Sequence, residues 1–375
     1  MSETAVQYYL VGGAVRDLLF GRLPRECDYA FSGGAERFVQ ANPRARKVGQ
    51  SVHVFLLDGQ EFMPLRGDDA ATDLLWRDLT VNALALEESG RLHLHPQALA
   101  DLRGRVLRAA SDHAFSDDPT RIFRLARFAA MAPDWTLDAD TLIQAREAVA
   151  GCAALPAERV CRELGKALRA PEPGRFLAVL HDCRALSPWF AELEGADAIP
   201  AGPAPYHQNS VLAHTMEVMN RLAGDPLAVW MALCHDLGKT GTEPDMLPHH
   251  YGHEQRGVAA AELLSRRLGM PRRWRQAGVL AAKLHMQGGK YASLRPGTRC
   301  DLLCAVQQAH AHDAFWRMAE ADSGQSLKPQ ADEDLRRILA VRLPENWRGK
   351  GAESGARLRI LRCQALSRRL YSGSK

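Results

Sequence analysis

The sequence predicts an α+β protein: a small α/β head with a mixed sheet at the N-terminus, followed by domains built only from helices. Within residues 6–110, short alternating apolar runs are bounded by Gly, Pro or Asp, which is typical of β-strands. From about residue 109, apolar side chains recur at helical spacing, as in the segment 121–130. The 375 residues leave ample length for two or three domains with buried cores.

The individual elements follow the same patterns along the chain. The predicted strands are Val6–Val11, Cys27–Phe31, Val52–Leu57 and Arg91–Leu94, and the predicted helices include residues 121–130 and 158–168. Three prolines in residues 199–205 indicate a linker, and the segment after them is rich in histidine. We therefore expect a head over residues 1–108, a helical neck and body over 109–199, a helical histidine-rich domain over 206–330 and a basic helical tail over 331–375.

Composition and charge exclude several classes of protein. No apolar run is long enough to span a bilayer, and the N-terminus lacks the basic and apolar segments of a secretory signal, so we expect no membrane partner. The eight cysteines include no C-x-x-C pair, which argues against zinc ribbons and favours reduced thiols in a cytoplasmic protein. Residues 331–375 hold 11 Lys and Arg against 5 Asp and Glu, a net charge of +6. A polyanionic partner and a solvated helix face explain this charge equally well. The sequence does not indicate whether the protein is a monomer or a homodimer.

A glycine turn and two acidic residues mark a candidate nucleotide site in the head. Gly12 and Gly13 lie where a predicted strand meets a predicted helix, a place where backbone amides can approach phosphate. Glu26 and Asp28 flank Cys27, and in a strand both carboxylates would point to one face. Their repulsion is relieved when Mg²⁺ lies between them and bridges to a triphosphate. On these residues alone, an ordinary turn and an edge strand with two solvated acids are the alternatives.

Further segments follow in an order that resembles the tRNA nucleotidyltransferase and bacterial poly(A) polymerase superfamily. The similar segments are GGAVRD (12–17) with the acid-x-acid pair at 26–28, LLWRDLTVNALAL (74–86), DLRGRVLRAA (101–110), FSDDPTRIFRLARFAA (115–130) and LPAERV (155–160). Together they cover roughly residues 8–170, and five motifs are in the expected order. They are most similar to the bacterial CCA-adding enzymes, which build the CCA end of tRNA without a nucleic-acid template.

The resemblance implies that the head is a nucleotidyltransferase palm, and it implies roles for specific residues. Glu26 and Asp28 would be catalytic and would hold Mg²⁺, which activates the tRNA 3′-hydroxyl and stabilises the departing pyrophosphate. The implied nucleotide-binding residues are Gly13, Arg16, Arg77, Asp118, Arg121 and Arg124, whereas Arg127 is expected to be structural. The pair Asp118 and Arg121 would accept from the exocyclic amine and donate to the ring nitrogen that cytosine and adenine share. The implied partners are CTP, ATP and the tRNA acceptor end.

The histidine-rich segment resembles the HD phosphohydrolase domain that follows the transferase in one branch of the CCA-adding enzymes. The similar segments are YHQNSVLAHTMEVM (206–219), LCHDLGKT (233–240) and HHYGH (249–253). The resemblance implies a site for a divalent metal of unknown identity formed by His214, His235, Asp236 and Asp322, with His253 and His285 as second-metal or phosphate contacts. It also implies 2′,3′-cyclic phosphodiesterase, 2′-nucleotidase and phosphatase activities. The alternative is a set of core histidines; His207, His310 and His312 are expected to be structural or on the surface.

Two departures from the family pattern keep other functions open. The first metal position is Glu26, where the family usually has Asp, and the extra methylene shifts the carboxylate by roughly one C–C bond. Asp28 and Arg77 lie 49 positions apart (77 − 28), which is shorter than is typical, in a segment that assists the switch from C to A in the family. The alternatives are a CC-adding tRNA nucleotidyltransferase, a poly(A) polymerase, against which the HD domain argues, and an HD phosphohydrolase with an idle RNA-binding head.

Overall fold

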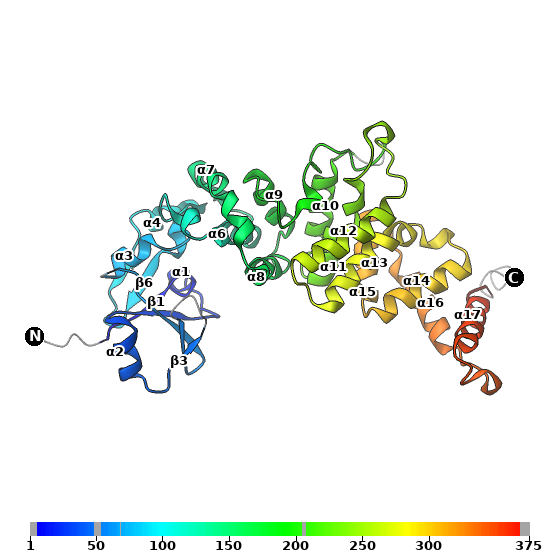
Figure 1. Ribbon diagram of the computed structural model, residues 1–375, viewed down its shortest axis with the longest axis horizontal. Coiled ribbons are helices and arrows are strands. Elements are labelled where there is room, and N and C mark those ends of the chain that lie inside the picture. Colours follow the sequence, from blue (N-terminus) through cyan, green and yellow to red (C-terminus); the bar gives the residue numbers. More distant parts are fainter. Residues whose placement is uncertain (1–5, 49–53, 68, 205–207, 368–375) are drawn as a thin grey trace, which may run out of the picture. The chain divides into compact units, whose positions relative to one another are not determined.

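The computed structural model confirms the predicted α+β class, with a mixed sheet near the N-terminus and helices along the rest of the chain (Figure 1). It describes residues 6–48, 54–67, 69–204 and 208–367. The chain divides into two compact units. Unit 1 comprises the residues up to Leu155 together with Asp182–Ala185, and unit 2 comprises Pro156–His181 and the residues from Leu186 onward. Among the helices described, none combines the length and apolar character needed to cross a membrane.

Unit 1 is built on a seven-stranded mixed sheet in the order β3-β4-β5-β2-β1-β6-β7. Its strands are β1 Tyr8–Val11, β2 Asp28–Phe31, β3 Arg46–Val48, β4 Val54–Leu57, β5 Gln60–Pro64, β6 Leu84–Glu87 and β7 Leu92–Leu94. β2 and β5 pair in parallel, and the other pairs described in this sheet are antiparallel. Strand β1 therefore lies between β2, which follows it closely in the chain, and β6, which follows much later.

Both faces of this sheet are covered by apolar packing. Phe31 of β2 and Phe62 of β5 pack with Phe38 of α2 (Gly34–Ala41), and the rings of Phe31 and Phe38 stack with their centroids 4.0 Å apart. Ala30, the neighbour of Phe31 in β2, belongs to a second cluster that includes Leu74 of α3 (Ala70–Leu75). Because adjacent residues of a strand point to opposite faces, α2 and α3 cover opposite faces of the sheet.

The remaining elements of unit 1 are short helices and a small second sheet. They are α1 Gly13–Leu19, η1 Thr80–Asn82, α4 Ala98–Gly104, β8 Val106–Leu107, α5 Ala114–Asp117, α6 Thr120–Met131, β9 Thr136–Leu137, α7 Ala139–Glu147 and η2 Val149–Ala154. The four predicted strands are present in shorter form as β1, β2, β4 and β7; residues 52 and 53 of the third lie outside the described residues. The helix predicted over 121–130 is confirmed as α6, whereas β3, β5 and β6 are not among the predicted strands.

In its described residues, unit 2 consists of helices joined by loops, with one isolated β-bridge between Pro200 and Ser210. Its elements are α8 Ala157–Ala167, α9 Gly174–Asp182 (whose last residue belongs to unit 1), η3 Ala191–Leu193, α10 Val211–Arg221, α11 Pro226–His235, η4 Leu237–Lys239, η5 Pro244–Met246, α12 His253–Arg267, α13 Arg272–Gly289, η6 Tyr291–Ser293, α14 Pro296–Gln308, α15 His312–Ser323, α16 Lys328–Ala340, η7 Glu345–Trp347 and α17 Ala352–Ser367. The predicted helix 158–168 is confirmed as α8. Of the prolines predicted to form a linker, Pro200 and Pro203 lie in unit 2, where Ala201 is buried and its amide donates to the Asn209 carbonyl, and Pro205 lies outside the described residues.

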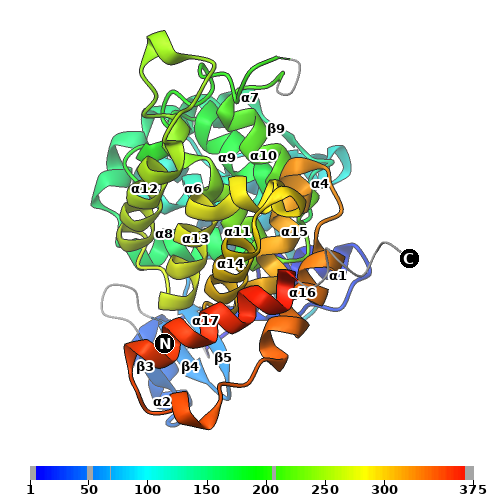
Figure 2. The ribbon, with the colours of Figure 1, turned by 90° about the vertical axis from the view of Figure 1, so that its right-hand side faces the viewer.

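Helix α11 is the central helix of unit 2. Every residue from Ala228 to His235 is buried, because the segment AVWMALC is apolar on all sides. The helix packs against α10, α13 and α15 (Figure 2). Its buried C-terminal end therefore brings His235 and Asp236 to a place where side chains from several other helices meet.

Candidate functional site

The glycine turn of unit 1 has the backbone geometry that only glycine adopts readily. β1 ends at Val11, Gly12 has φ +70°, and α1 begins at Gly13. The Gly12 amide donates to the carbonyl of Leu84 at 2.9 Å, and the Gly12 carbonyl accepts from the amide of Arg16 at 3.2 Å. The turn thus joins the first strand to β6 and sets the direction of α1.

A chain of polar side chains connects this turn to two other motifs. Arg16 Nη1 donates to Asn82 Oδ1 at 2.6 Å, and Asn82 Nδ2 donates to Asp78 Oδ1 at 3.1 Å. The other carboxylate oxygen of Asp78 accepts from Arg124, with Nε at 2.8 Å and Nη2 at 2.6 Å. Asp78 and Asn82 lie four positions apart around η1, and Arg124 lies on α6. Residues 16, 78–82 and 124 are therefore one connected network, which we call the Asp78 network.

Asp78 is held in its charged form. Burial alone would raise the pKa of this carboxyl, but the Arg124 guanidinium and the hydrogen bonds from Asn82 and the Leu79 amide hold its pKa well below the usual range. The sequence pattern placed this residue in a motif without giving it a role. The sequence feature that could have indicated a role for Asp78 is its position four residues before the amide of Asn82 in an otherwise apolar segment.

Replacing Asp78 with asparagine should lower the free energy of unfolding by about 2 kcal/mol at neutral pH, because it removes the ion pair with half-buried Arg124. Since the pKa of Asp78 is lower in the folded state, its contribution is present above the unfolded pKa and is lost as the pH falls below it. Urea unfolding should therefore show a constant difference between the two proteins from pH 8 to pH 5, and a shrinking one below about pH 4. A difference that persists unchanged to pH 3 would contradict the charge effect. Asp58→Asn, at an exposed pair with Arg44, is the control and should leave stability nearly unchanged.

The two predicted Mg²⁺ ligands lie beside the glycine turn in the sheet. Asp28 is the first residue of β2, exposed, and is paired in register with Val11 at the end of β1. Glu26 is exposed and lies in a bend before the strand begins. The inference that both carboxylates point to one face of a strand therefore does not hold for Glu26, because the chain bends before Asp28. The direction of the Glu26 carboxylate is set by this bend rather than by the alternation of a strand.

The remaining predicted nucleotide contacts are engaged within the protein. Arg77 forms an ion pair with Asp73, with Nε at 2.9 Å from Oδ2. Arg121 is buried, and its guanidinium donates to the carbonyls of Ala114, at 2.8 Å, and Trp76. Asp118, between α5 and α6, accepts from the amide of Thr120 at 3.1 Å. Three guanidinium groups surround the Phe128 ring, with their carbons 6.0, 5.9 and 4.0 Å from its centroid: those of Arg16, Arg124 and Arg127.

In unit 2, the four predicted metal ligands converge from three helices. His214 of α10 has Nε2 3.0 Å from Asp322 Oδ1 of α15 and 3.7 Å from Asp236 Oδ2. His235, at the end of α11, has Nε2 3.2 Å from Asp236 Oδ2 and 3.4 Å from His214 Nε2. The donor atoms of His214, His235 and Asp236 lie close enough to share one cation. Sequence spacing gave no information on these distances, because the ligands are up to 108 positions apart.

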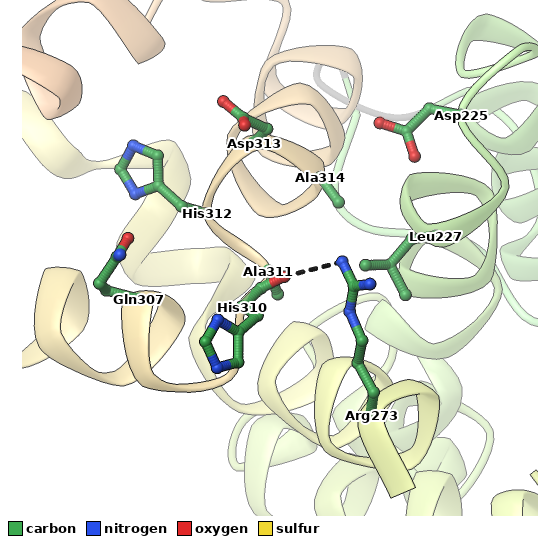
Figure 3. Close-up of a pocket in the computed structure, with 9 residues that line it drawn as sticks. All are labelled: Asp225, Leu227, Arg273, Gln307, His310, Ala311, His312, Asp313 and Ala314. Carbon is green, nitrogen blue, oxygen red and sulfur yellow. Dashed lines mark hydrogen bonds between the residues drawn. The ribbon is translucent and has the colours of Figure 1, made fainter. Parts of the chain in front are cut away.

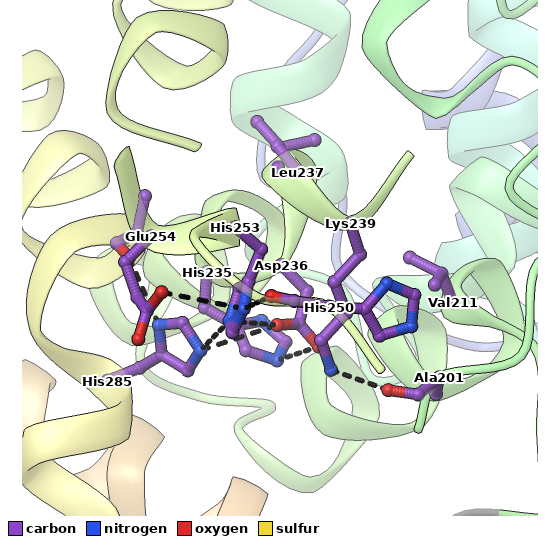
Figure 4. A network of polar contacts seen from close by, with 12 residues as sticks. Ala201, Val211, His235, Asp236, Leu237, Lys239, His250, His253, Glu254 and His285 are labelled. Carbon is purple, nitrogen blue, oxygen red and sulfur yellow. Dashed lines mark hydrogen bonds and ion pairs between the residues drawn. The ribbon is translucent and has the colours of Figure 1, made fainter. Parts of the chain in front are cut away.

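A second group of donors lies on the other side of Asp236. His285 Nε2 of α13 is 3.4 Å from Asp236 Oδ1, and His253 Nε2 of α12 is 3.8 Å from the same oxygen. The two histidine nitrogens are 3.1 Å apart. Figure 4 shows these side chains pointing toward one another, with Asp236 beside the two histidines. Asp236 therefore belongs to two groups of possible metal ligands, one with His214 and His235 and one with His253 and His285.

The histidines are oriented as metal ligands. Nδ1 of His235 donates to the Ala232 carbonyl at 2.6 Å, and Nδ1 of His253 donates to the His250 carbonyl at 2.7 Å. Nδ1 of His285 likewise faces the carbonyls of its own helix. Because a carbonyl only accepts, these contacts fix the proton on Nδ1 and turn the Nε2 lone pair toward the site.

The surroundings of Asp236 also suit a residue that binds a metal ion. It is buried, and neither of its oxygens accepts a hydrogen bond of ordinary geometry from a described residue, although Lys239 Nζ lies 2.7 Å from Oδ2. Burial alone would lower the pKa of His235, but Asp236 and Asp322 raise it to about 9. Burial would raise the pKa of Asp322, but His214 and His235 lower it to about 2. The carboxylates thus favour positive charge among the imidazoles, which is the charge that a divalent cation supplies.

Lys239 is a member of this site that the sequence pattern did not assign. Its ammonium group is buried between Asp236 Oδ2 and the carbonyl of Ala201, at 2.7 Å from each. Lys239 is three positions after Asp236, and both lie at the turn that contains η4. A buried lysine needs an acidic partner, so its spacing from Asp236 was the available signal.

Gly238 permits the close packing between η4 and α12 that holds His253 in place. A methyl group at this position would overlap the backbone carbonyl of His253 and the backbone amide of Gly257. Gly238→Ala should therefore lower the free energy of unfolding of unit 2 by about 3 kcal/mol, the upper range for overpacking, because backbone atoms cannot rotate away. Thermal denaturation measures this loss. Gly355→Ala, in open space on α17, is the control and should raise stability slightly; equal melting temperatures for the two variants would contradict the packing argument.

The histidines predicted to lie outside the sites have separate surroundings. His312 Nε2 lies 2.8 Å from Asp332 Oδ1, and His310 is at a left-handed turn with φ +52°. Both line a surface pocket of about 330 Å³, where Arg273 donates to the His310 carbonyl at 3.1 Å (Figure 3). His207 lies outside the described residues.

Comparison with known proteins establishes the family of this chain. No family model matches it. It is 35% identical to the multifunctional CCA protein of Xanthomonas euvesicatoria pv. vesicatoria, over 93% of each chain. A solved complex of a CCA-adding enzyme with ATP shares its fold with a TM-score of 0.67 at 17% identity, over 96% of this chain and 86% of the other. The Thermotoga maritima CCA-adding enzyme, solved with tRNA, has a TM-score of 0.63 at 18% identity, over 96% and 87%. The predicted resemblance is confirmed, and the chain belongs to the family of multifunctional CCA proteins, which are CCA-adding tRNA nucleotidyltransferases.

Proposed function

We propose that the chain adds C, C and A to the 3′ end of tRNA from CTP and ATP, with release of pyrophosphate. The observation that supports this most directly is the Asp78 network, which joins the glycine turn, the η1 motif and the α6 motif by hydrogen bonds. A head without nucleotide chemistry would have no need to align these three segments. We assign this chemistry to residues 1–108, nucleotide selection and tRNA binding to 109–199, and a second activity to 206–330, which the basic tail over 331–375 follows.

In this proposal the glycine turn and the acidic residues receive the triphosphate. Glu26 and Asp28 would hold Mg²⁺, which lowers the pKa of the tRNA 3′-hydroxyl and offsets negative charge on the leaving pyrophosphate. The Gly13 amide, at the start of α1, would donate to a phosphate oxygen. Arg16 would donate to the same triphosphate while Asn82 holds its Nη1, so that its orientation is fixed before the nucleotide arrives.

Nucleotide selection would depend on residues at the start of α6. Asp118 would accept a hydrogen bond from the exocyclic amine of cytosine or adenine, and Arg121 would donate to the ring nitrogen beside it. Arg121 already donates to Ala114 and Trp76, so base recognition requires a remaining N–H group or a small rearrangement. Arg77 and Arg124 would be further nucleotide contacts in unit 1.

We further propose that unit 2 hydrolyses phosphate esters, with 2′,3′-cyclic phosphodiesterase, 2′-nucleotidase and phosphatase activities. A divalent cation would be held by His214, His235, Asp236 and Asp322. The nitrogen and oxygen donors of these residues suit a first-row transition metal, and the bound cation would supply a hydroxide nucleophile at neutral pH. His253 and His285 would hold a second cation or a phosphate oxygen. Lys239 would keep the Asp236 carboxylate charged through its 2.7 Å ion pair.

The test of the transferase proposal uses tRNA transcripts that end before the first C, after one C and after CC. Each is incubated with the protein, Mg²⁺ and one labelled nucleotide, CTP, ATP, UTP or GTP in turn. Two additions of C followed by one of A support CCA synthesis. Addition that stops at CC supports the second candidate, a CC-adding enzyme, which the short interval between Asp28 and Arg77 favours. No addition from any transcript overturns both and leaves the chemistry to unit 2.

A further inference from the structure

Helix α8 carries a row of basic side chains on the face opposite its buried one. Three of them lie within the helix at intervals of three and four residues, and the fourth follows directly after its last turn; all are exposed: Arg159, Arg162, Lys166 and Arg169. Arg169 folds back along the helix, because its Nη1 donates to the carbonyl of Gly165. The row extends roughly 15 Å, which is long enough to meet several phosphates of one nucleic-acid strand.

Few acidic groups offset the charge of this row. Arg162 pairs with Glu158 at 2.9 Å, and both side chains are more than half exposed, so the pair is weak and its guanidinium can turn to another anion. The other acid of the helix, Glu163, is buried. Within the described part of the chain, no carboxylate forms an ion pair with Lys166. The exposed face of α8 therefore has a surplus of positive charge.

The connection between α12 and α13 is a second concentration of positive charge. Residues 265–275 contain five arginines and no acidic residue. Arg267 forms a two-pronged ion pair with Glu192 of η3, with nitrogen–oxygen distances of 2.7 and 2.6 Å. Arg266 and Arg272 are exposed. The ion pair of Arg267 thus anchors the connection while its exposed neighbours remain open to solvent.

The two basic segments lie side by side within unit 2. Cys161 Sγ of α8 lies 3.6 Å from Met270 Sδ in the connection, although the two residues are 109 positions apart in the chain. Arg162 follows Cys161 directly, and Arg272 is two positions after Met270. We call the exposed basic residues of the two segments the basic surface: Arg159, Arg162, Lys166, Arg169, Arg266 and Arg272.

We propose that the basic surface binds the phosphate backbone of tRNA, so that the histidine-rich domain takes part in holding the RNA through the connection between α12 and α13. This inference rests on the proposed function, which supplies tRNA as the nucleic-acid partner. Arginine suits the contact, because its planar guanidinium donates two parallel hydrogen bonds to phosphate oxygens. Phosphate contacts fix position without reading base sequence, as an enzyme that acts on many different tRNAs requires.

The basic tail is less suited to this role, because its arginines are engaged with the protein. Arg359 of α17 forms a two-pronged ion pair with Asp301 of α14, with distances of 2.7 and 2.6 Å. The guanidinium carbon of Arg357 lies 5.5 Å from the centroid of the Trp347 ring. These contacts attach α17 to its neighbours and use the charge that a phosphate would need, whereas the basic surface keeps its charge exposed.

The experiment measures binding of a labelled tRNA transcript that lacks its CCA end to the full chain, over a range of salt concentrations. One double variant changes α8, Lys166→Gln with Arg169→Gln, and the other changes the connection, Arg266→Gln with Arg272→Gln. Each should raise Kd about tenfold or more at 0.1 M salt, and each should reduce the slope of log Kd against log salt by about 1 to 2, because fewer counterions are released. Thermal denaturation should be nearly unchanged, since all four positions are exposed.

The matched control is Lys283→Gln with Lys290→Gln, which makes the same change of charge at exposed positions on α13 and just after it. It should bind tRNA with the wild-type Kd and slope. Wild-type affinity in either test variant would overturn the proposal, because the proposal requires both segments. An equal loss of affinity in the control would also overturn it, since binding would then follow net charge alone.

Addition of CTP by the same proteins distinguishes this inference from the proposed function. Both test variants should raise KM for tRNA about tenfold and leave kcat and KM for CTP at the wild-type values, because the surface holds the RNA equally before and during the reaction. A wild-type protein that binds tRNA through this surface but adds no nucleotide would refute the transferase and support the surface. A wild-type protein that binds no tRNA would overturn both.

Discussion

Asp28→Asn should reduce the rate of CTP addition to tRNA by about 10³-fold or more. The amide keeps the size of the side chain but removes the negative charge that would hold Mg²⁺ against the triphosphate, and phosphoryl transfer depends on positioning and charge stabilisation. Because Asp28 is exposed at the start of β2, the substitution should leave the fold of the head intact. The measurement is single-turnover addition of labelled CTP to a transcript that lacks its CCA end, over a range of Mg²⁺ concentrations.

The matched control for this variant is Asp58→Asn, an exposed carboxylate of the same unit whose partner is Arg44. It should add CTP at the wild-type rate. Glu26→Asp provides a second comparison, because it restores the shorter side chain that the family usually has at this position. Addition by Asp28→Asn at more than about a tenth of the wild-type rate would refute the assignment of Asp28 to the metal.

Asp236→Asn should strongly weaken metal binding and abolish phosphate-ester hydrolysis in unit 2. Asp236 is the residue common to both groups of possible ligands, so its loss removes a charged donor from each. We expect metal affinity to fall by at least about 100-fold, more than for loss of a residue that only orients a ligand. Isothermal titration with Mn²⁺, Co²⁺ and Zn²⁺ measures affinity, and release of phosphate from a 2′-nucleotide measures hydrolysis.

Two comparisons distinguish this effect from unfolding. Asp236→Asn leaves buried Lys239 without its acidic partner, so nucleotide addition by the head and the thermal transition of the full chain are measured alongside. His253→Gln should weaken only the second group of ligands and retain one bound cation. Asp245→Asn, an exposed acid of the same unit, should retain full metal binding and hydrolysis. Unchanged affinity in Asp236→Asn would rule out the metal site as proposed.

The parts of the fold that could be predicted are those whose side chains have a strong apolar pattern. The helix α6 repeats apolar residues at helical spacing, and β1 and β4 are short apolar runs. β3 consists of Arg46, Lys47 and Val48, all exposed, and therefore has no such pattern. It is a strand because its backbone pairs with β4, 6 to 10 positions later in the chain, a pairing that its own three side chains do not indicate.

The candidate sites likewise have features that the sequence predicts and features that only the folded structure determines. The resemblance pointed to the candidate metal ligands of unit 2, yet only the packing of α10, α11 and α15 determines that His214 and Asp322 lie 3.0 Å apart. In the head, the bend before β2 excludes Glu26 from the strand, and the carbonyls of Ala114 and Trp76 engage Arg121. Backbone carbonyls are present at every residue, so no sequence motif indicates which of them will accept from a particular arginine.

The position of β1 between β2 and β6 has a consequence for synthesis of the chain on the ribosome. β2 follows β1 within about twenty residues, but β6 leaves the ribosome only after residue 87 has been made. Until then β1 is an edge strand with unpaired backbone groups, and the Gly12 amide lacks the Leu84 carbonyl to which it donates. The nascent head thus has an open sheet edge next to its glycine turn for more than seventy residues of translation, since β6 begins at position 84 and β1 ends at position 11. During that interval the edge is open to pairing with other chains, and arrival of β6 both closes the edge and completes the turn.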